Sequence, residues 1–142
     1  MKCHAVIDTN VLVAALLTKR RDSPTIRVLD AIPGGTIVPL IHVDIIAEYV
    51  EVLHRDKFQL REETISGIIR IMTQFGLPVA PVPTSEILPD TDDRIFYEAA
   101  LAMGDGSAYL VTGNKKHFPS KDFVVSLAEM MAIVDGVTPS IN

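Results

Sequence analysis

The sequence predicts an α/β protein with a mostly parallel central sheet packed between helices. Residues 5–7 (AVI) form a continuous apolar run, which is typical of a strand buried on both faces of a parallel sheet. Later strand-like runs alternate with segments of helical apolar spacing. No internal repeat, low-complexity stretch or linker interrupts this alternation, so we expect one domain.

Each element follows from local apolar spacing and from the residues that begin or end it. The strands are expected, in order, at residues 5–7, 36–39, 79–82, 109–112 and 123–125. The helices are expected, in order, at residues 11–17, 24–32, 43–53, 62–74, 93–103 and 127–133. Ser23 and Pro24 suit an N-cap and a first helical position, and Ser126 is expected to cap the last helix.

Two helices have spacing clear enough to predict which face lies against the core. In the helix at residues 43–53 the predicted inward residues are Val43, Ile46, Ala47, Val50 and Leu53. In the helix at residues 62–74 they are Ile65, Ile68, Ile69 and Met72. Gly76 is expected to end this second helix, because glycine often follows a helix C-terminus.

Composition bounds the class of protein. The chain has 142 residues, 48% hydrophobic and 22% charged, an ordinary globular balance. Its one cysteine, Cys3, excludes an internal disulfide and a multi-cysteine zinc site. We see no secretory signal and no apolar run long enough to cross a bilayer, and therefore expect a cytoplasmic protein without a membrane partner. The formal net charge of −5 argues against nucleic acid unless a cation offsets the carboxylates.

Acidic and polar side chains stand at the ends of predicted elements. Asp8 and Asn10 follow the first strand, Asn114 follows the fourth, and a run of acids at residues 90–93 precedes a helix in which Asp93 shares a face with apolar residues. Carboxyl ends of parallel strands meet at one edge of a sheet, where ligands bind. Carboxylates gathered at such an edge repel one another, which favours a bound Mg²⁺ or Mn²⁺.

Four motifs resemble those of PIN-domain ribonucleases, in the order found in that family. They are residues 6–12 (VIDTNVL), 47–53 (AEYVEVL), 90–96 (DTDDRIF) and 110–115 (LVTGNK). The resemblance implies a three-layer α/β/α sandwich at residues 1–135, with a tail at residues 136–142. It implies Mg²⁺- or Mn²⁺-dependent endonuclease activity on single-stranded RNA. The third and fourth motifs look most like those of VapC-type toxins, which implies a cognate antitoxin and a homodimer.

The resemblance also implies roles for individual residues. Asp8, Glu48 and Asp93 match the acidic positions and are expected to bind metal and act in catalysis. Asn10 is expected to orient the first carboxylate or a water. Asn114 is expected to act in catalysis as a neutral oxygen ligand or by holding a metal-bound water. It stands where many relatives have aspartate, which removes one charge from the site. Supporting roles are expected for three further residues, Asp90, Asp92 and Thr112.

Other interpretations of these residues remain open. Lys115 and Lys116 lie beside the predicted site and are expected to contact RNA phosphates, although lysines in a loop are often only solvated. Asp8 could instead be the nucleophile of a phosphotransfer domain, but Asn10 stands where that chemistry usually has a second aspartate. Asn114 keeps alive a third possibility, a non-catalytic RNA- or protein-binding module with the same fold.

Overall fold

The computed structural model describes residues 2–104 and 106–136. Its centre is a five-stranded sheet in the order β3-β2-β1-β4-β5, and every pair of neighbouring strands is parallel. The strands are β1 (Cys3–Ile7), β2 (Ile37–Ile41), β3 (Leu77–Pro78), β4 (Tyr109–Val111) and β5 (Val124–Val125). The predicted α/β class with a parallel sheet is confirmed. The described part of the predicted tail at residues 136–142 is Gly136 alone.

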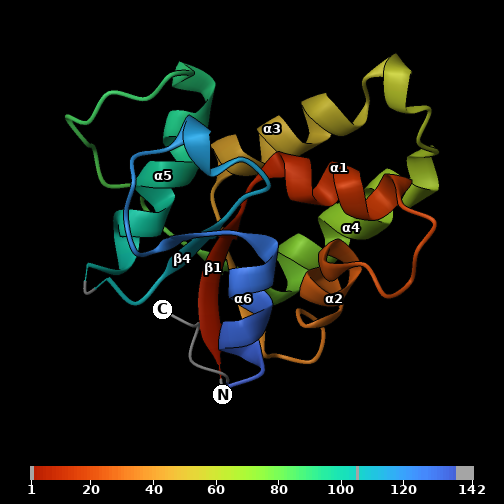
Figure 1. Ribbon diagram of the computed structural model, residues 1–142. Coiled ribbons are helices and arrows are strands. Elements are labelled where there is room, and N and C mark those ends of the chain that lie inside the picture. Colours follow the sequence, from red (N-terminus) through yellow and green to blue (C-terminus); the bar gives the residue numbers. More distant parts are fainter. Residues whose placement is uncertain (1, 105, 137–142) are drawn as a thin grey trace.

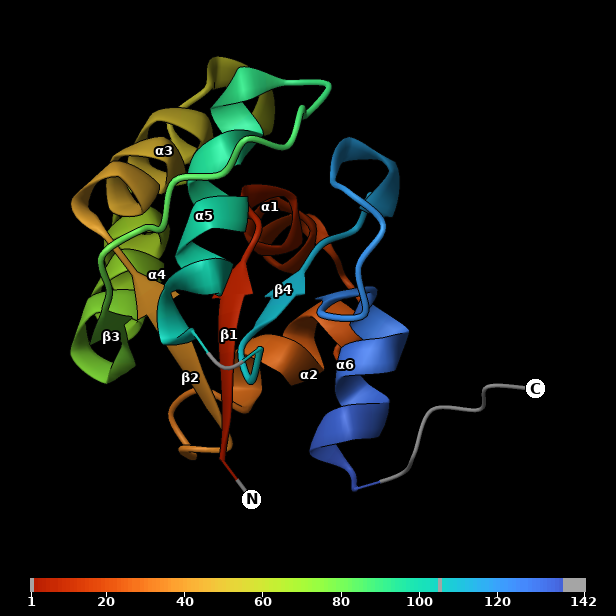
Figure 2. The same ribbon diagram turned by 90° about the vertical axis from the view of Figure 1, so that its left-hand side faces the viewer.

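Helices cover both faces of this sheet, which gives the three layers that were predicted. They are α1 (Thr9–Leu17), α2 (Pro24–Asp30), α3 (Val43–Leu53), α4 (Glu62–Phe75), α5 (Arg94–Ala100) and α6 (Leu127–Val134). In Figure 1, α5 lies on one side of β1 and β4, while α1, α2, α4 and α6 lie on the other. Figure 2 views the sheet from the α5 side, with that helix in front of the strands.

The core explains why the strands are continuously apolar. Ile7 on β1, Leu40 on β2 and Leu110 on β4 are fully buried, because helices pack against both faces of the sheet. Phe96 of α5 and Tyr49 of α3 meet with their ring centroids 6.1 Å apart. In the part of the chain that the structure describes, no helix is long and apolar enough to span a bilayer.

The predicted inward face of α3 is right at Leu53 and wrong at Val43, Ala47 and Val50. Val43 is 72% exposed, and Ala47 and Val50 are also exposed. The buried residues are Ile45, Tyr49, Val52 and Leu53. They follow the same helical period, on a face turned around the helix from the predicted one. Tyr49 can lie on the buried face because its hydroxyl donates a hydrogen bond to the backbone, and its ring then packs like that of an apolar residue.

Three boundaries also differ from the sequence prediction. The third strand is Leu77–Pro78 rather than residues 79–82, because the chain turns from the sheet towards α5, where the amide of Val82 donates to the Glu98 carbonyl. The second strand runs through Pro39 to Ile41. The helix expected at residues 93–103 divides into a 3₁₀ turn, α5 and a second 3₁₀ turn at Leu101–Met103.

Gly76 ends α4 for a reason other than the predicted one. Its φ of −81° is open to any residue, so no left-handed conformation demands glycine here. A Cβ atom at this position would instead lie 2.3 Å from the Met72 carbonyl oxygen and 2.9 Å from Cγ2 of Ile41. The absence of a side chain therefore lets the end of α4 pack tightly against β2.

We expect Gly76→Ala to lower the free energy of unfolding by about 1–3 kcal/mol, because the new methyl group meets backbone that cannot easily move. Gly67→Ala is the matched control. Gly67 lies inside α4 with open space around it, so alanine there should stabilise by roughly 0.5–1 kcal/mol. Urea denaturation of both variants measures the difference. Equal effects would contradict the close-packing explanation.

Candidate functional site

Asp8 lies at the carboxyl end of the central strand, between the sheet and α1. Its amide donates to the Val111 carbonyl at 3.0 Å, and its own carbonyl accepts from the Val11 amide that begins α1. The Asp8 side chain makes no capping hydrogen bond to the helix. The residue is only 5% exposed. Asp8 is therefore a nearly buried carboxylate whose position is fixed by backbone contacts on both sides.

Two hydroxyl groups hold this end of the sheet. The Oγ1 of Thr112, a fully buried residue, donates to Oδ2 of Asp8 at 2.7 Å and accepts from the Asn114 amide at 3.0 Å. The Tyr49 hydroxyl donates to the Ile7 carbonyl at 2.5 Å, immediately before Asp8. Burial raises the pKa of Asp8, and the hydrogen bond from Thr112 opposes that rise. The sequence placed Thr112 near the site, and its direct bond to Asp8 gives it a clear positioning role.

Asn10 makes a different contact from the one expected. Its Oδ1 accepts from the Gly113 amide at 3.2 Å and so joins the loop after β1 to the loop after β4. Its expected role in orienting Asp8 or a water stays a prediction, since its side-chain oxygen is bonded to Gly113. The close approach of these loops keeps Thr112 against Asp8.

Asp93 faces the same site from the start of α5. It ends the 3₁₀ turn η2 (Thr91–Asp93), which Asp90 caps by accepting from the Asp92 amide at 2.9 Å. Asp93 is itself the N-cap residue of α5, but its carboxylate makes no capping hydrogen bond. Oδ2 of Asp93 is buried and accepts no hydrogen bond from any described residue.

The charge on Asp93 is costly where it lies. Burial raises its pKa to about 6, with further upward contributions from Asp8, Asp90 and Asp92. His117 opposes this shift, and its Nδ1 lies 3.5 Å from Oδ2 of Asp93. Asp8 acts on the pKa of Asp93, and His117 acts on the pKa of both carboxyls, so the two acidic residues lie on either side of the same loop.

His117 makes a contact with Asp93 that the sequence did not indicate. It belongs to the 3₁₀ turn η4 (Lys115–His117) that follows β4. Its Nε2 lies 3.0 Å from Nδ2 of Asn114, so the ring connects Asn114 to Asp93. The amide nitrogen can only donate, which assigns Nε2 as the acceptor and puts the proton of the neutral ring on Nδ1, towards Asp93. Its place after a strand at the ligand-binding edge was the one signal available.

Glu48 lies at the periphery of the pair formed by Asp8 and Asp93. It is half-buried on α3, and burial raises the pKa of its carboxyl. The largest charge effects on it come from Glu51 and Asp92, both of which raise the pKa further. On α3, Glu48 lies at the edge of the buried face that Ile45, Tyr49 and Val52 form.

The chemistry of this donor set fits a hard divalent cation. Among the carboxylates that the structure describes, Asp8, Glu48 and Asp93 are the ones with a raised pKa. All three offer oxygen ligands, and the unpartnered oxygen of Asp93 is a ready acceptor for a cation. In residues 2–104 and 106–136, however, no three acidic, histidine or cysteine side chains already stand close enough to enclose an ion.

The lysines beside the site differ in their partners. Lys115 forms an ion pair with Glu129 of α6 at 2.9 Å, and Lys121 pairs with Glu86 at 3.2 Å. Lys116 is exposed and has no partner among the described residues. The sequence grouped Lys115 with Lys116, whereas the structure separates a paired lysine from a free one.

The family is established by comparison with known proteins. A family model described as PIN domain matches residues 4–116, and the chain belongs to that family. The match covers all four motifs from which the resemblance was drawn. No curated protein matches the sequence. PIN domains are nuclease folds in general, and their nucleases typically use divalent metals, which agrees with the acidic edge described above.

Proposed function

We propose that this protein is a Mg²⁺- or Mn²⁺-dependent endoribonuclease that cleaves single-stranded RNA. The observation that supports it most directly is the buried Oδ2 of Asp93, which accepts no hydrogen bond from a described residue and belongs to a carboxyl whose pKa is raised by burial and by the Asp8 charge. A protein that buries two repelling carboxylates at the ligand-binding edge of a parallel sheet loses stability unless a cation neutralises them. Membership of a nuclease family supports the same conclusion.

Different residues of the chain would bind the cation and hold its ligands in position. Asp8 and Asp93 would hold the cation, with Glu48 as the third oxygen donor. A divalent cation, when bound, supplies a nucleophile from water at neutral pH and offsets charge on the phosphate. Thr112 fixes Asp8, while Asn114 and His117 fix Asp93 from the opposite loop. Hydrolysis breaks the bond to the 3′ oxygen, giving a 3′-hydroxyl and a 5′-phosphate.

The biological setting belongs to the same proposal. Resemblance of the third and fourth motifs to VapC-type toxins supports a role as the toxin of a toxin–antitoxin pair. Such a toxin would act in the cytoplasm as a homodimer and would be blocked by a cognate antitoxin. Growth arrest on induced expression, relieved by a neighbouring gene, is the expected result. Normal growth during expression of active nuclease would contradict the toxin role.

The proposed activity is tested with purified protein and labelled single-stranded RNA. We expect cleavage with Mn²⁺ or Mg²⁺, none with EDTA, and little on a fully paired duplex. The fragments should carry 5′-phosphates, which a phosphatase-sensitive shift on a gel reveals. Absence of cleavage with every divalent metal would overturn the proposal.

A second candidate is a binding module that has kept the fold without the chemistry. Two observations favour it: the neutral Asn114 at the fourth position, with its amide engaged by His117, and the lack of three assembled metal ligands in the described chain. This candidate predicts RNA or protein binding that is unchanged by EDTA, and no cleavage.

A further inference from the structure

A groove opens directly from the candidate site towards α6. It has a volume of about 530 Å³ and is bounded by residues 112–116, by residues 126–128 at the start of α6, and by Pro24 of α2. Thr112 and Asn114 belong both to this groove and to the hydrogen-bonded site around Asp8. The groove therefore adjoins the site, with Thr112 and Asn114 common to both.

The charge of the groove is opposite to that of the protein. Lys115 and Lys116 line it, and none of the described residues in its lining is acidic, although the whole chain carries a net charge of −5. The carboxylates of the candidate site adjoin this lining: Asp8 accepts from Thr112, and Asp93 faces His117, the residue after Lys116. This polarity suits a polyanion whose reacting phosphate meets a cation at the acidic end and whose next phosphate meets a lysine.

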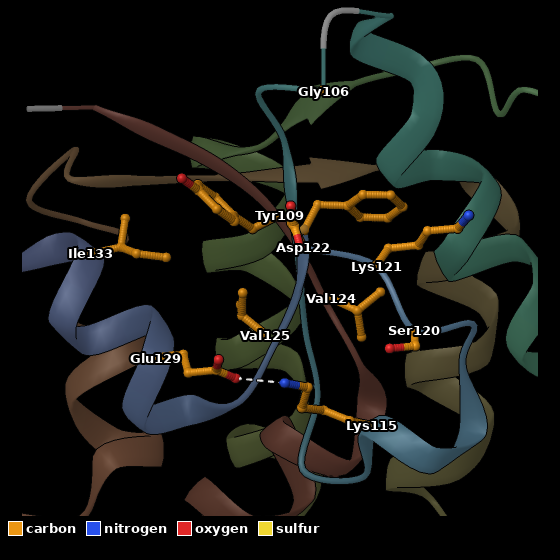
Figure 3. A pocket seen from close by; sticks show the side chains of 11 residues that line it. Gly106, Tyr109, Lys115, Ser120, Lys121, Asp122, Val124, Val125, Glu129 and Ile133 are labelled. Atoms are coloured by element: carbon orange, nitrogen blue, oxygen red, sulfur yellow. Dashed lines mark hydrogen bonds and ion pairs between the residues drawn. The ribbon is translucent and has the colours of Figure 1, made fainter. Parts of the chain in front are cut away.

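Lys116 is the lysine free to make that contact. Figure 3 shows the Lys115 side chain directed towards Glu129, with which its ammonium pairs at 2.9 Å. Glu129 also accepts from the Ser126 amide, so its carboxylate anchors the N-terminus of α6 and is not easily released. Lys116 would bind a phosphate without first breaking an ion pair. Lys115 also lines the groove, but its ammonium group is held in the ion pair with Glu129.

The remaining wall favours a strand recognised through its backbone. Pro24, Leu127 and Ala128 provide an apolar surface against which ribose can pack, and no aromatic side chain is present for base stacking. The side-chain amide of Asn114 is a group able to read a base edge, but it is already bonded to His117. Contacts with phosphate and sugar position a nucleic acid but carry little sequence information.

We infer that this groove holds the nucleotide next to the scissile phosphate of a single-stranded RNA, with Lys116 on its phosphate and the first turn of α6 beneath its ribose. This inference rests on the proposed nuclease function and adds the path of the strand to it. Recognition along this path is through the backbone, so specificity for an RNA must come from elsewhere.

The test compares Lys116→Ala with two other variants. We expect it to weaken binding of a fluorescent 12-nucleotide RNA about three- to tenfold in Ca²⁺, and to lower the slope of log affinity against log salt by about 0.7. Lys57→Ala removes the same charge from the turn between α3 and α4 and should change neither. Lys115→Ala should have the smaller effect of the two groove lysines. If Lys116→Ala and Lys57→Ala bind alike, the inference is wrong.

A second variant approaches the groove without removing a lysine. Ala128→Glu places a carboxylate in the first turn of α6, where a negative charge suits the helix dipole, so the fold should be unharmed. We expect weaker binding of the 12-mer and a raised KM, with cleavage of a dinucleotide unchanged because it has no flanking phosphate. If both variants weaken binding but the wild-type protein does not cleave RNA, the groove inference stands and the nuclease proposal is wrong. If the wild type cleaves RNA and neither variant weakens binding, the nuclease proposal stands and the groove inference is wrong.

Discussion

Replacing Asp93 with asparagine is expected to make the metal-free protein more stable and the metal-loaded protein inactive. At pH 8 the wild-type protein must hold Asp93 ionised, although its pKa in the folded state is about 6 against a usual 3.8. That difference corresponds to a penalty on the order of 1–3 kcal/mol. Asparagine removes the charge with nearly the same shape, so the melting temperature should rise by roughly 3–8 °C.

The pH dependence of this gain has a definite sign. The folded-state pKa of Asp93 is raised, so its ionised form destabilises the fold and the penalty is fully present above pH about 6. It declines as the pH falls through 6 and disappears below 3.8, where the carboxyl is protonated in both states. The difference in melting temperature between Asp93→Asn and wild type should therefore stay constant from pH 8 down to just above 6 and then shrink towards pH 4.5.

Metal should reverse the order of stability. Millimolar Mn²⁺ is expected to raise the melting temperature of the wild type and leave Asp93→Asn unchanged, because binding stabilises only a protein that retains the ligand. Asp92→Asn is the matched control: Asp92 is exposed, and its loss should have little effect on stability. A lower melting temperature for metal-free Asp93→Asn at pH 8 would show that the carboxylate is a structural element instead.

Asp8→Asn is expected to reduce RNA cleavage by at least about a thousandfold. The asparagine oxygen can still accept the Thr112 hydrogen bond, so the end of β1 should keep its structure while the charge is lost. Asp44→Asn removes one negative charge from an exposed position on α3 and should cleave like the wild type. Initial rates in Mn²⁺ with a labelled 12-mer measure both variants.

The comparison also separates chemistry from binding. If Asp8→Asn cleaved at the wild-type rate, the proposed role of Asp8 as a metal ligand would be wrong. Near-UV circular dichroism and the melting temperature check that the variant is folded. Because Asp8 is buried and its pKa is raised, the metal-free variant should be at least as stable as the wild type.

The sheet and most of the site could be predicted because they follow from backbone periodicity. Asp8 and Thr112 stand where two parallel strands end, and that rule alone brings them together. Asp93 was placed by its helical register with Phe96, which is indeed buried. The metal-binding roles of Asp8, Glu48 and Asp93 and the catalytic role of Asn114 stay predictions, because geometry alone does not identify an ion.

The parts that escaped prediction depend on contacts without periodicity. The bond from Gly113 to Asn10 joins residues 103 positions apart, and the ring of His117 reaches Asp93 from another loop. Hydropathy also misplaced the inward face of α3, because Tyr49 combines a large buried ring with one polar atom. Side-chain partners in loops are set by three-dimensional packing, which one sequence does not report.

The hydrogen bond from Thr112 to Asp8 has a consequence for synthesis of the protein. Its two ends are 104 positions apart, so the site cannot assemble until β4 has docked against β1. A chain still on the ribosome with β4 inside the exit tunnel carries Asp8 but lacks the threonine, the Asn114 loop and His117. The proposed site therefore stays incomplete until β4 has left the tunnel and docked against β1.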